Sequence, residues 1–173
     1  PGDADTVWVT VSGLQEGYYL AAAGVQLQGD INPTNDVALQ SFRVGDGVPL
    51  IITEVLCNPA NEDTDEFIEL HYPGPGVFDI TQCSFTDGDA LDQIVQWDEQ
   101  YGTVTDPDAV ISPYITEGSY ALILDREYPQ GSQPYDLPPG TTVLTTNNTT
   151  LGDALTGTDP LTLYDQEGTA MAN

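Results

Sequence analysis

The chain has 173 residues, of which 28 are acidic and only two, Arg43 and Arg126, are basic, giving a formal net charge of −26. Because lysine and arginine supply the affinity for nucleic-acid phosphates and anionic membranes, this balance excludes direct binding to either. No apolar run has the length that crosses a membrane as a helix, so membrane insertion is not expected. Frequent glycine (17) and proline (13), with 39% apolar residues, predict many short strands joined by turns.

Two explanations of the acidity remain open. An acidic, lysine-free surface stays hydrated at high salt, as in halophilic proteins, and a secreted protein can also surround its carboxylates with divalent cations. Two arginines cannot pair so many carboxylates, so salt, bound cations or spacing must screen the self-repulsion. The chain begins without Met and shows no signal peptide, so we expect a piece of a longer secreted or cell-surface protein.

Residues 1–46 contain three strand patterns. Residues 7–11 alternate valine with tryptophan and threonine, a second alternating run extends from Tyr19 to Leu27, and a third covers Val37–Val44. Three strands leave one face uncovered, so they pack on the next domain, pair with another chain or stay partly disordered. Their edges are a predicted route to partners, including other copies of the chain.

Gly45–Pro49 is predicted to be a short linker, and a second domain starts at Leu50. The apolar run Leu50–Leu56 and the run beginning at Phe67 predict two strands joined by an acidic loop. Of the side chains on these runs, Ile68, Leu70 and Tyr72 are predicted to face the core opposite Ile52 and Leu56.

Glu54 and Glu69 fall on the polar phase of these two runs, so their carboxylates approach each other if the strands pair. Such a pair would be a cation site, a pair with a raised pKa, or two solvated carboxylates. The rest of the chain offers no catalytic constellation, because His71 is the single histidine and no phosphate-binding or nucleophile motif occurs. We therefore expect a non-enzymatic protein; the alternative is a fragment of a secreted metal-assisted hydrolase.

Three oxygen-rich loops are candidate calcium sites, since calcium takes six to eight oxygen ligands. None has the EF-hand spacing, and such clusters also arise by composition in so acidic a chain. The candidate ligands are Asp30, Asn32 and Asp36 in the first loop, Asp63 and Asp65 in the second, and Asp87 and Asp89 in the third. If these loops bind calcium, the chain is a calcium-dependent adhesion module.

Cys57 and Cys83 are the two cysteines, and no Cys/His cluster indicates zinc. An even pair in a turn-rich acidic chain predicts either a disulfide in an oxidising compartment or two buried free thiols.

From Leu50 to Asn173 the chain resembles the lamin tail domain, an immunoglobulin-like β-sandwich found in nuclear lamins and bacterial surface proteins. The matching stretches are Ile52–Val55 with Asn58-Pro59, Glu66–Leu70, Phe78–Thr81, Gly118–Asp125, Leu151–Leu155 and Leu161–Asp165. The chain departs from the family at Cys83, where tryptophan is usual, and at an insertion over residues 98–108. A disulfide between Cys57 and Cys83 is one way to occupy the space of the absent indole.

Residues 1–46 resemble the last strands of CARDB-like adhesion modules, which are immunoglobulin-type domains. The resemblance rests on Leu14, on Gly17-Tyr18-Tyr19 and on the polar cluster between Asp30 and Asp36. The two resemblances together imply an all-β, non-catalytic structural or binding module of an extracellular or cell-surface protein. Its expected role is tethering, or interaction with a protein or carbohydrate at the cell surface.

Overall fold

The computed structural model describes residues 8–15, 17–24, 37–45, 50–61, 64–81 and 83–172. The protein is all-β, as predicted: the described residues form thirteen strands and two three-residue 3-10 helices, at Glu99–Tyr101 and Tyr128–Gln130. Most of the connections between the strands contain glycine or proline, consistent with the composition.

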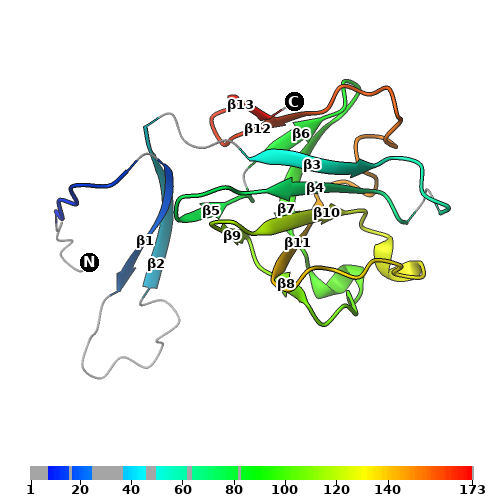
Figure 1. The fold of residues 1–173 in the computed structure, drawn as a ribbon, viewed down its shortest axis with the longest axis horizontal. Coiled ribbons are helices and arrows are strands. Elements are labelled where there is room, and N and C mark those ends of the chain that lie inside the picture. Colours follow the sequence, from blue (N-terminus) through cyan, green and yellow to red (C-terminus); the bar gives the residue numbers. More distant parts are fainter. Residues whose placement is uncertain are drawn as a thin grey trace, which may run out of the picture.

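The first two strands form a separate hairpin. β1 (Gly17–Gly24) and β2 (Val37–Val44) pair antiparallel along their whole length, and β1 also contacts β5 (Val77–Asp79). Figure 1 shows this hairpin standing beside one end of the main sheet. The predicted strand at Val37–Val44 is confirmed, and β1 covers the first part of the run predicted from Tyr19.

The strand predicted over residues 7–11 is wrong for residues 8–11, which lie in the non-strand segment 8–15. Its alternating valines fit a half-buried strand, but among the described residues β1 pairs only with β2, so no ladder includes this segment. A strand is stabilised by hydrogen bonds to a neighbour, and alternation alone does not supply one.

A nine-stranded sheet makes up most of the protein (Figure 1). Eight of its strands follow the order β13-β12-β6-β7-β11-β10-β4-β3, while β8 pairs with β11 at the end that β7 leaves free. Its strands are β3 (Ile51–Leu56), β4 (Phe67–His71), β6 (Ser84–Thr86), β7 (Leu91–Gln96), β8 (Ala109–Ile111), β10 (Tyr120–Leu124), β11 (Thr141–Thr146), β12 (Thr162–Tyr164) and β13 (Ala170–Ala172). β5 pairs separately with β9 (Tyr114–Thr116). The terminal strands β3 and β13 contact each other without being paired, so the sheet curls until its two edges meet.

β3 and β4 are the two strands predicted from Leu50–Tyr72, and they pair antiparallel. The predicted burial of Ile68, Leu70 and Tyr72 is confirmed. The prediction that Ile52 and Leu56 share a core face is wrong, because the register shifts between Ile52 and Glu54. This bulge reverses the phase of the strand, so that Ile52 packs on one core and Leu56 on another.

Two hydrophobic cores lie against the sheet. The first contains buried side chains from one face of several strands, such as Leu70 of β4, Phe85 of β6, Ile94 of β7 and Ile123 of β10, together with Cys83. The second includes Trp97, Leu124 and Tyr128, and Tyr101 and Val104 pack on it. The predicted insertion at residues 98–108 thus covers a second face of the sheet. All six residues of β11 are buried, as expected for a strand covered on both faces.

The structure holds Cys57 and Cys83 as free thiols, which is one of the two predicted alternatives, except that Cys57 is only partly buried. Cys83 is fully buried in the first core, and Cys57 packs against that core while staying partly exposed. Cys83 thus shares the first core with aliphatic and aromatic side chains.

Candidate interaction surfaces

A hollow of about 750 Å³ lies between the β1–β2 hairpin and residues 8–14; we call it the hairpin groove. Its hairpin side is mainly one face of the ladder, because alternate positions of β2 from Ala38 to Val44 line it together with their cross-strand partners Ala21 and Ala23. The lining residues are Val9, Val11, Leu14, Ala21, Ala22, Ala23, Ala38, Gln40, Phe42 and Val44. Nine of these ten are aliphatic or aromatic. An occupant of the groove would therefore make apolar contacts and almost no hydrogen bonds to the lining side chains.

The apolar side chains around the hairpin are unusually accessible. Trp8 is 90% exposed and Val9 80%, and on the other face of the hairpin Leu39 is 50% exposed. Tyr19 stacks on its cross-strand partner Phe42 with ring centroids 5.7 Å apart. Between Thr6 and Gly29 the chain carries a single acidic residue, Glu16, although it has 28 in all. Contiguous exposed apolar surface with little charge marks an interaction site on a soluble protein.

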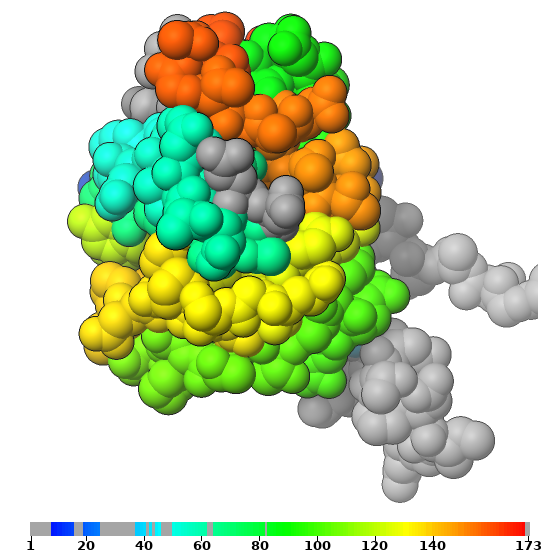
Figure 2. Space-filling view, turned by 90° about the vertical axis from the view of Figure 1, so that its right-hand side faces the viewer, coloured from blue at the N-terminus to red at the C-terminus, as the bar shows by residue number. Residues whose placement is uncertain are grey.

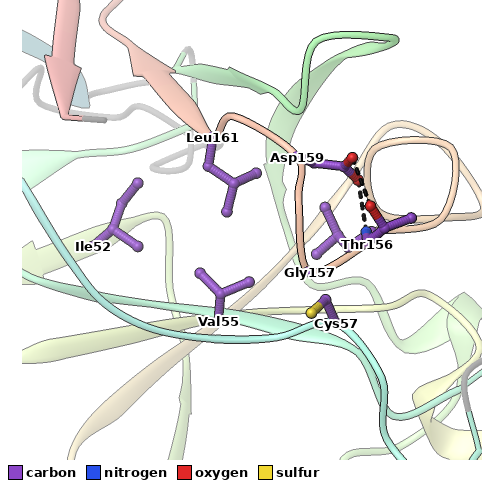
Figure 3. A pocket seen from close by; sticks show the side chains of 8 residues that line it. Ile52, Val55, Cys57, Thr156, Gly157, Asp159 and Leu161 are labelled. Atoms are coloured by element: carbon purple, nitrogen blue, oxygen red, sulfur yellow. Dashed lines mark hydrogen bonds between the residues drawn. The ribbon is translucent and has the colours of Figure 1, made fainter.

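A second hollow, of about 400 Å³, opens where the edges of the main sheet meet; we call it the seam groove. β3 forms one wall with Ile52 and Val55, and Cys57 follows directly after this strand. The loop before β12 forms the other wall (Figure 3), with Leu155, Thr156, Gly157, Asp159 and Leu161. The Asp159 carboxylate accepts hydrogen bonds from the Thr156 backbone N–H at 2.6 Å and from Thr156 Oγ1 at 2.7 Å, which holds the loop in shape.

Of the predicted calcium ligands, Asp30, Asn32, Asp36 and Asp63 lie outside the described residues. Asp65 is buried, and its carboxylate accepts hydrogen bonds from Asn61 Nδ2 at 3.0 Å and Thr64 Oγ1 at 2.8 Å. These bonds close the loop between β3 and β4, so the Asp65 carboxylate has a structural role in the fold as it stands.

In the third predicted loop, Asp87 Oδ1 accepts hydrogen bonds from the backbone N–H groups of Asp89 at 3.1 Å and Ala90 at 2.9 Å. The Asp89 side chain is exposed beside this turn, and the buried Asp92 accepts a bond from the Gly152 N–H at 2.8 Å. Within the described ranges, no three His, Cys, Asp or Glu side chains form a group that could hold a metal ion. Asp87 and Asp92 thus satisfy backbone donors at turns.

A buried carboxyl group was missed by sequence reasoning. Asp125 is 2% exposed, its Oδ1 accepts a hydrogen bond from the Glu127 N–H at 2.8 Å, and its own N–H donates to the Glu66 carbonyl. Burial raises the pKa of Asp125 to about 8, aided by the Glu127 side chain and the charge of Glu66. The available signal was its place directly after the fully apolar run of β10.

The segment that carries Asp125 crosses one face of the molecule. In Figure 2 it lies in yellow between the teal loop after β3 and the green segment after β7. Tyr135 donates a hydrogen bond to the Asp65 carbonyl on one side, and Gln133 accepts one from the Thr105 N–H on the other. The segment is thus tied to both neighbours, and the acidic residues Asp65, Glu66 and Asp125 are buried.

No family model, curated protein or solved structure matches this chain. The resemblances to the lamin tail domain and to CARDB-like modules therefore stay predictions. The helices within the described residues are single 3-10 turns, and none could cross a membrane.

Proposed function

We propose that this chain is a non-catalytic binding module of a larger secreted or cell-surface protein, and that it contacts another protein through the β1–β2 hairpin. The observation that carries the proposal is the exposed, nearly uncharged apolar surface of the hairpin and residues 8–14. We further propose that residues 50–173 are an immunoglobulin-like sandwich of the lamin tail type, and that the hairpin belongs to an adhesion-type module before it.

An isolated two-stranded hairpin is marginally stable in water, and a third strand or a packed face is needed for independent stability. In the described residues β1 and β2 pair only with each other, so each keeps one edge open. A partner protein with a sheet edge of its own can hydrogen-bond to these backbone groups and cover the apolar side chains at the same time.

A protein fits the hairpin groove better than a carbohydrate does. Sugars are recognised by aromatic faces combined with several hydrogen-bonding side chains, whereas Gln40 is the single polar side chain that lines this groove. Valine, alanine and leucine provide the dispersion contacts and hydrophobic burial that join two protein surfaces.

The acidic surface sets the conditions of binding. A net charge of −26 repels other acidic proteins at low salt, while the hairpin contributes little to that repulsion. Screening shortens the range of the repulsion to a few ångströms at molar salt, so association through the hairpin should strengthen as salt rises. We place the module in a salt-rich extracellular setting on this ground.

The test uses the apolar surface itself. We expect the neutral dye Nile red to bind the native chain. In sedimentation velocity, the native chain should associate with itself at about 2 M NaCl but not at about 0.2 M. The paired substitutions Val9→Ser and Val11→Ser should abolish both signals. Leu91→Ser, at an exposed apolar position of β7, is the matched control and should change neither. A native chain that binds no dye and stays monomeric at every salt concentration would overturn the proposal.

A further inference from the structure

The seam groove lies beside β3, an edge strand of the main sheet. β3 is the last strand in the sheet order and pairs only with β4 among the described residues. β13, at the opposite end of the order, contacts β3 without pairing to it. The outer edge of β3 therefore presents backbone N–H and C=O groups next to a hollow.

The seam groove lies at the point where the first core reaches the surface. Ile52, Val55 and Leu161 line it and pack against that core, yet each stays partly exposed. Figure 3 shows these three side chains facing the same space from the two walls. An occupant with aliphatic side chains would bury them fully and would complete the core at this edge.

The charge of the surroundings decides which occupant fits. Asp159 is the one charged residue among those that line the groove. The whole chain has a net charge of −26 and no lysine, and its two arginines lie far apart in the sequence. No segment of a second copy could bring several basic groups, so an occupant with complementary charge must be a different polypeptide.

We propose that the seam groove binds an extended peptide segment of another protein, which adds as a strand to the free edge of β3. Alternate side chains of the segment are aliphatic and enter the groove, because side chains two residues apart in a strand point to the same face. Lysine or arginine residues flank them and meet the acidic surface. This site is separate from the hairpin groove and does not rest on the function proposed above.

The probe is a rhodamine-labelled peptide of sequence KVTVTVK, followed by fluorescence anisotropy at about 0.2 M and about 2 M NaCl. We expect saturable binding that weakens with salt. The analogue EVTVTVE should bind at least tenfold more weakly, because its terminal glutamates are repelled by the acidic surface that attracts the lysines. Equal binding of the two peptides, or no binding of the basic peptide at either salt concentration, would overturn the proposal.

Two independent blocks test the location. Gly157 accepts a side chain, because a Cβ built there meets only Cys57 Sγ at 3.9 Å, so Gly157→Phe fills the groove from its wall. Alkylation of Cys57 with N-ethylmaleimide fills it from β3 without any substitution. Each block should weaken binding roughly tenfold, the effect of losing one buried anchor. Ser132→Phe, at an exposed position outside the groove, should leave the affinity within about twofold.

The remaining outcomes are equally decisive. Unchanged peptide affinity after both blocks would show that the peptide binds elsewhere and would overturn the assignment. Dimerisation of the native chain that Gly157→Phe abolishes would overturn it in favour of a second copy as occupant. The paired Val9→Ser and Val11→Ser substitutions should not change peptide binding, so failure of the hairpin proposal and failure of this one are distinguishable.

Discussion

Glu54 lies directly opposite Glu69 in the ladder between β3 and β4. The bulge residue Thr53 donates a hydrogen bond from its Oγ1 to Glu69 Oε1 at 2.6 Å, which positions one of the two carboxylates. Like charges opposite each other destabilise a sheet, and no lysine occurs in the chain to balance them. The predicted pairing of the two strands, which sets the two glutamates opposite each other, is confirmed.

Glu54→Lys should stabilise the protein by replacing this like-charge pair with an attractive one. We expect the free energy of unfolding to rise by about 0.5–1 kcal/mol at low salt, and by less at molar salt. Glu167→Lys, on an exposed turn, changes the net charge equally and is the control. Denaturant unfolding of both variants measures the effect. Equal stabilisation by the two substitutions would mean that overall charge, rather than the Glu54–Glu69 pair, is responsible.

Asp125 should make the protein less stable as the pH rises. Its pKa is about 8 in the fold against 3.8 for an aspartate carboxyl in water, so the folded state binds an extra proton between these two pH values. Stability is therefore retained at low pH and lost as the pH rises toward 8. Asp125→Asn keeps the shape but cannot ionise. Its stability relative to the native chain should therefore improve by about 3–4 kcal/mol between pH 5 and 8, at about 1.4 kcal/mol per pH unit.

Urea unfolding at constant salt measures that difference. Asp89→Asn, on an exposed turn, removes a carboxyl group without affecting a buried one and serves as the control. A constant difference between Asp125→Asn and the native chain over this pH range would contradict the buried, protonated state of Asp125.

The two thiols should differ in reactivity. Cys83 is fully buried, and its burial and the nearby carboxylates raise its pKa, so both access and ionisation protect it. Cys57 lines the seam groove and is partly exposed. Neutral dithiodipyridine should therefore titrate one thiol in the folded chain and two in denaturant. Cys57→Ser should leave none in the folded chain, whereas a native chain with no thiol even in denaturant would contain a disulfide.

Arg126 should hold the segment after β7 onto the second core. Its guanidinium lies 4.3 Å from the centre of the Tyr101 ring, and its Nη2 donates a hydrogen bond to the Thr146 carbonyl. Arg126→Met keeps the aliphatic stem and removes both interactions, so we expect a loss of about 1–2 kcal/mol in the free energy of unfolding. A double-mutant cycle with Tyr101→Leu isolates the ring contact; purely additive losses would show that the ring and the guanidinium do not interact.

The sequence by itself determined the all-β class and the pairing of the strands at Leu50–Leu56 and Phe67. These features follow from local alternation and turn residues, which act over a few positions. The composition also determines the net charge of −26. The same local rules misplaced residues 8–11, which alternate like a strand but have no neighbour to pair with.

Only the tertiary structure decided the sites. The bulge beside Thr53 sends Ile52 and Leu56 to different cores, and a bulge leaves no periodic trace in a short strand. The curl of the sheet brings β3 against the loop at Leu155–Leu161 and so creates the seam groove. The burial of Asp125 likewise depends on segments distant in the chain. Such proximity is set by topology, because the order of strands in a sheet is not encoded in the pattern of any one strand.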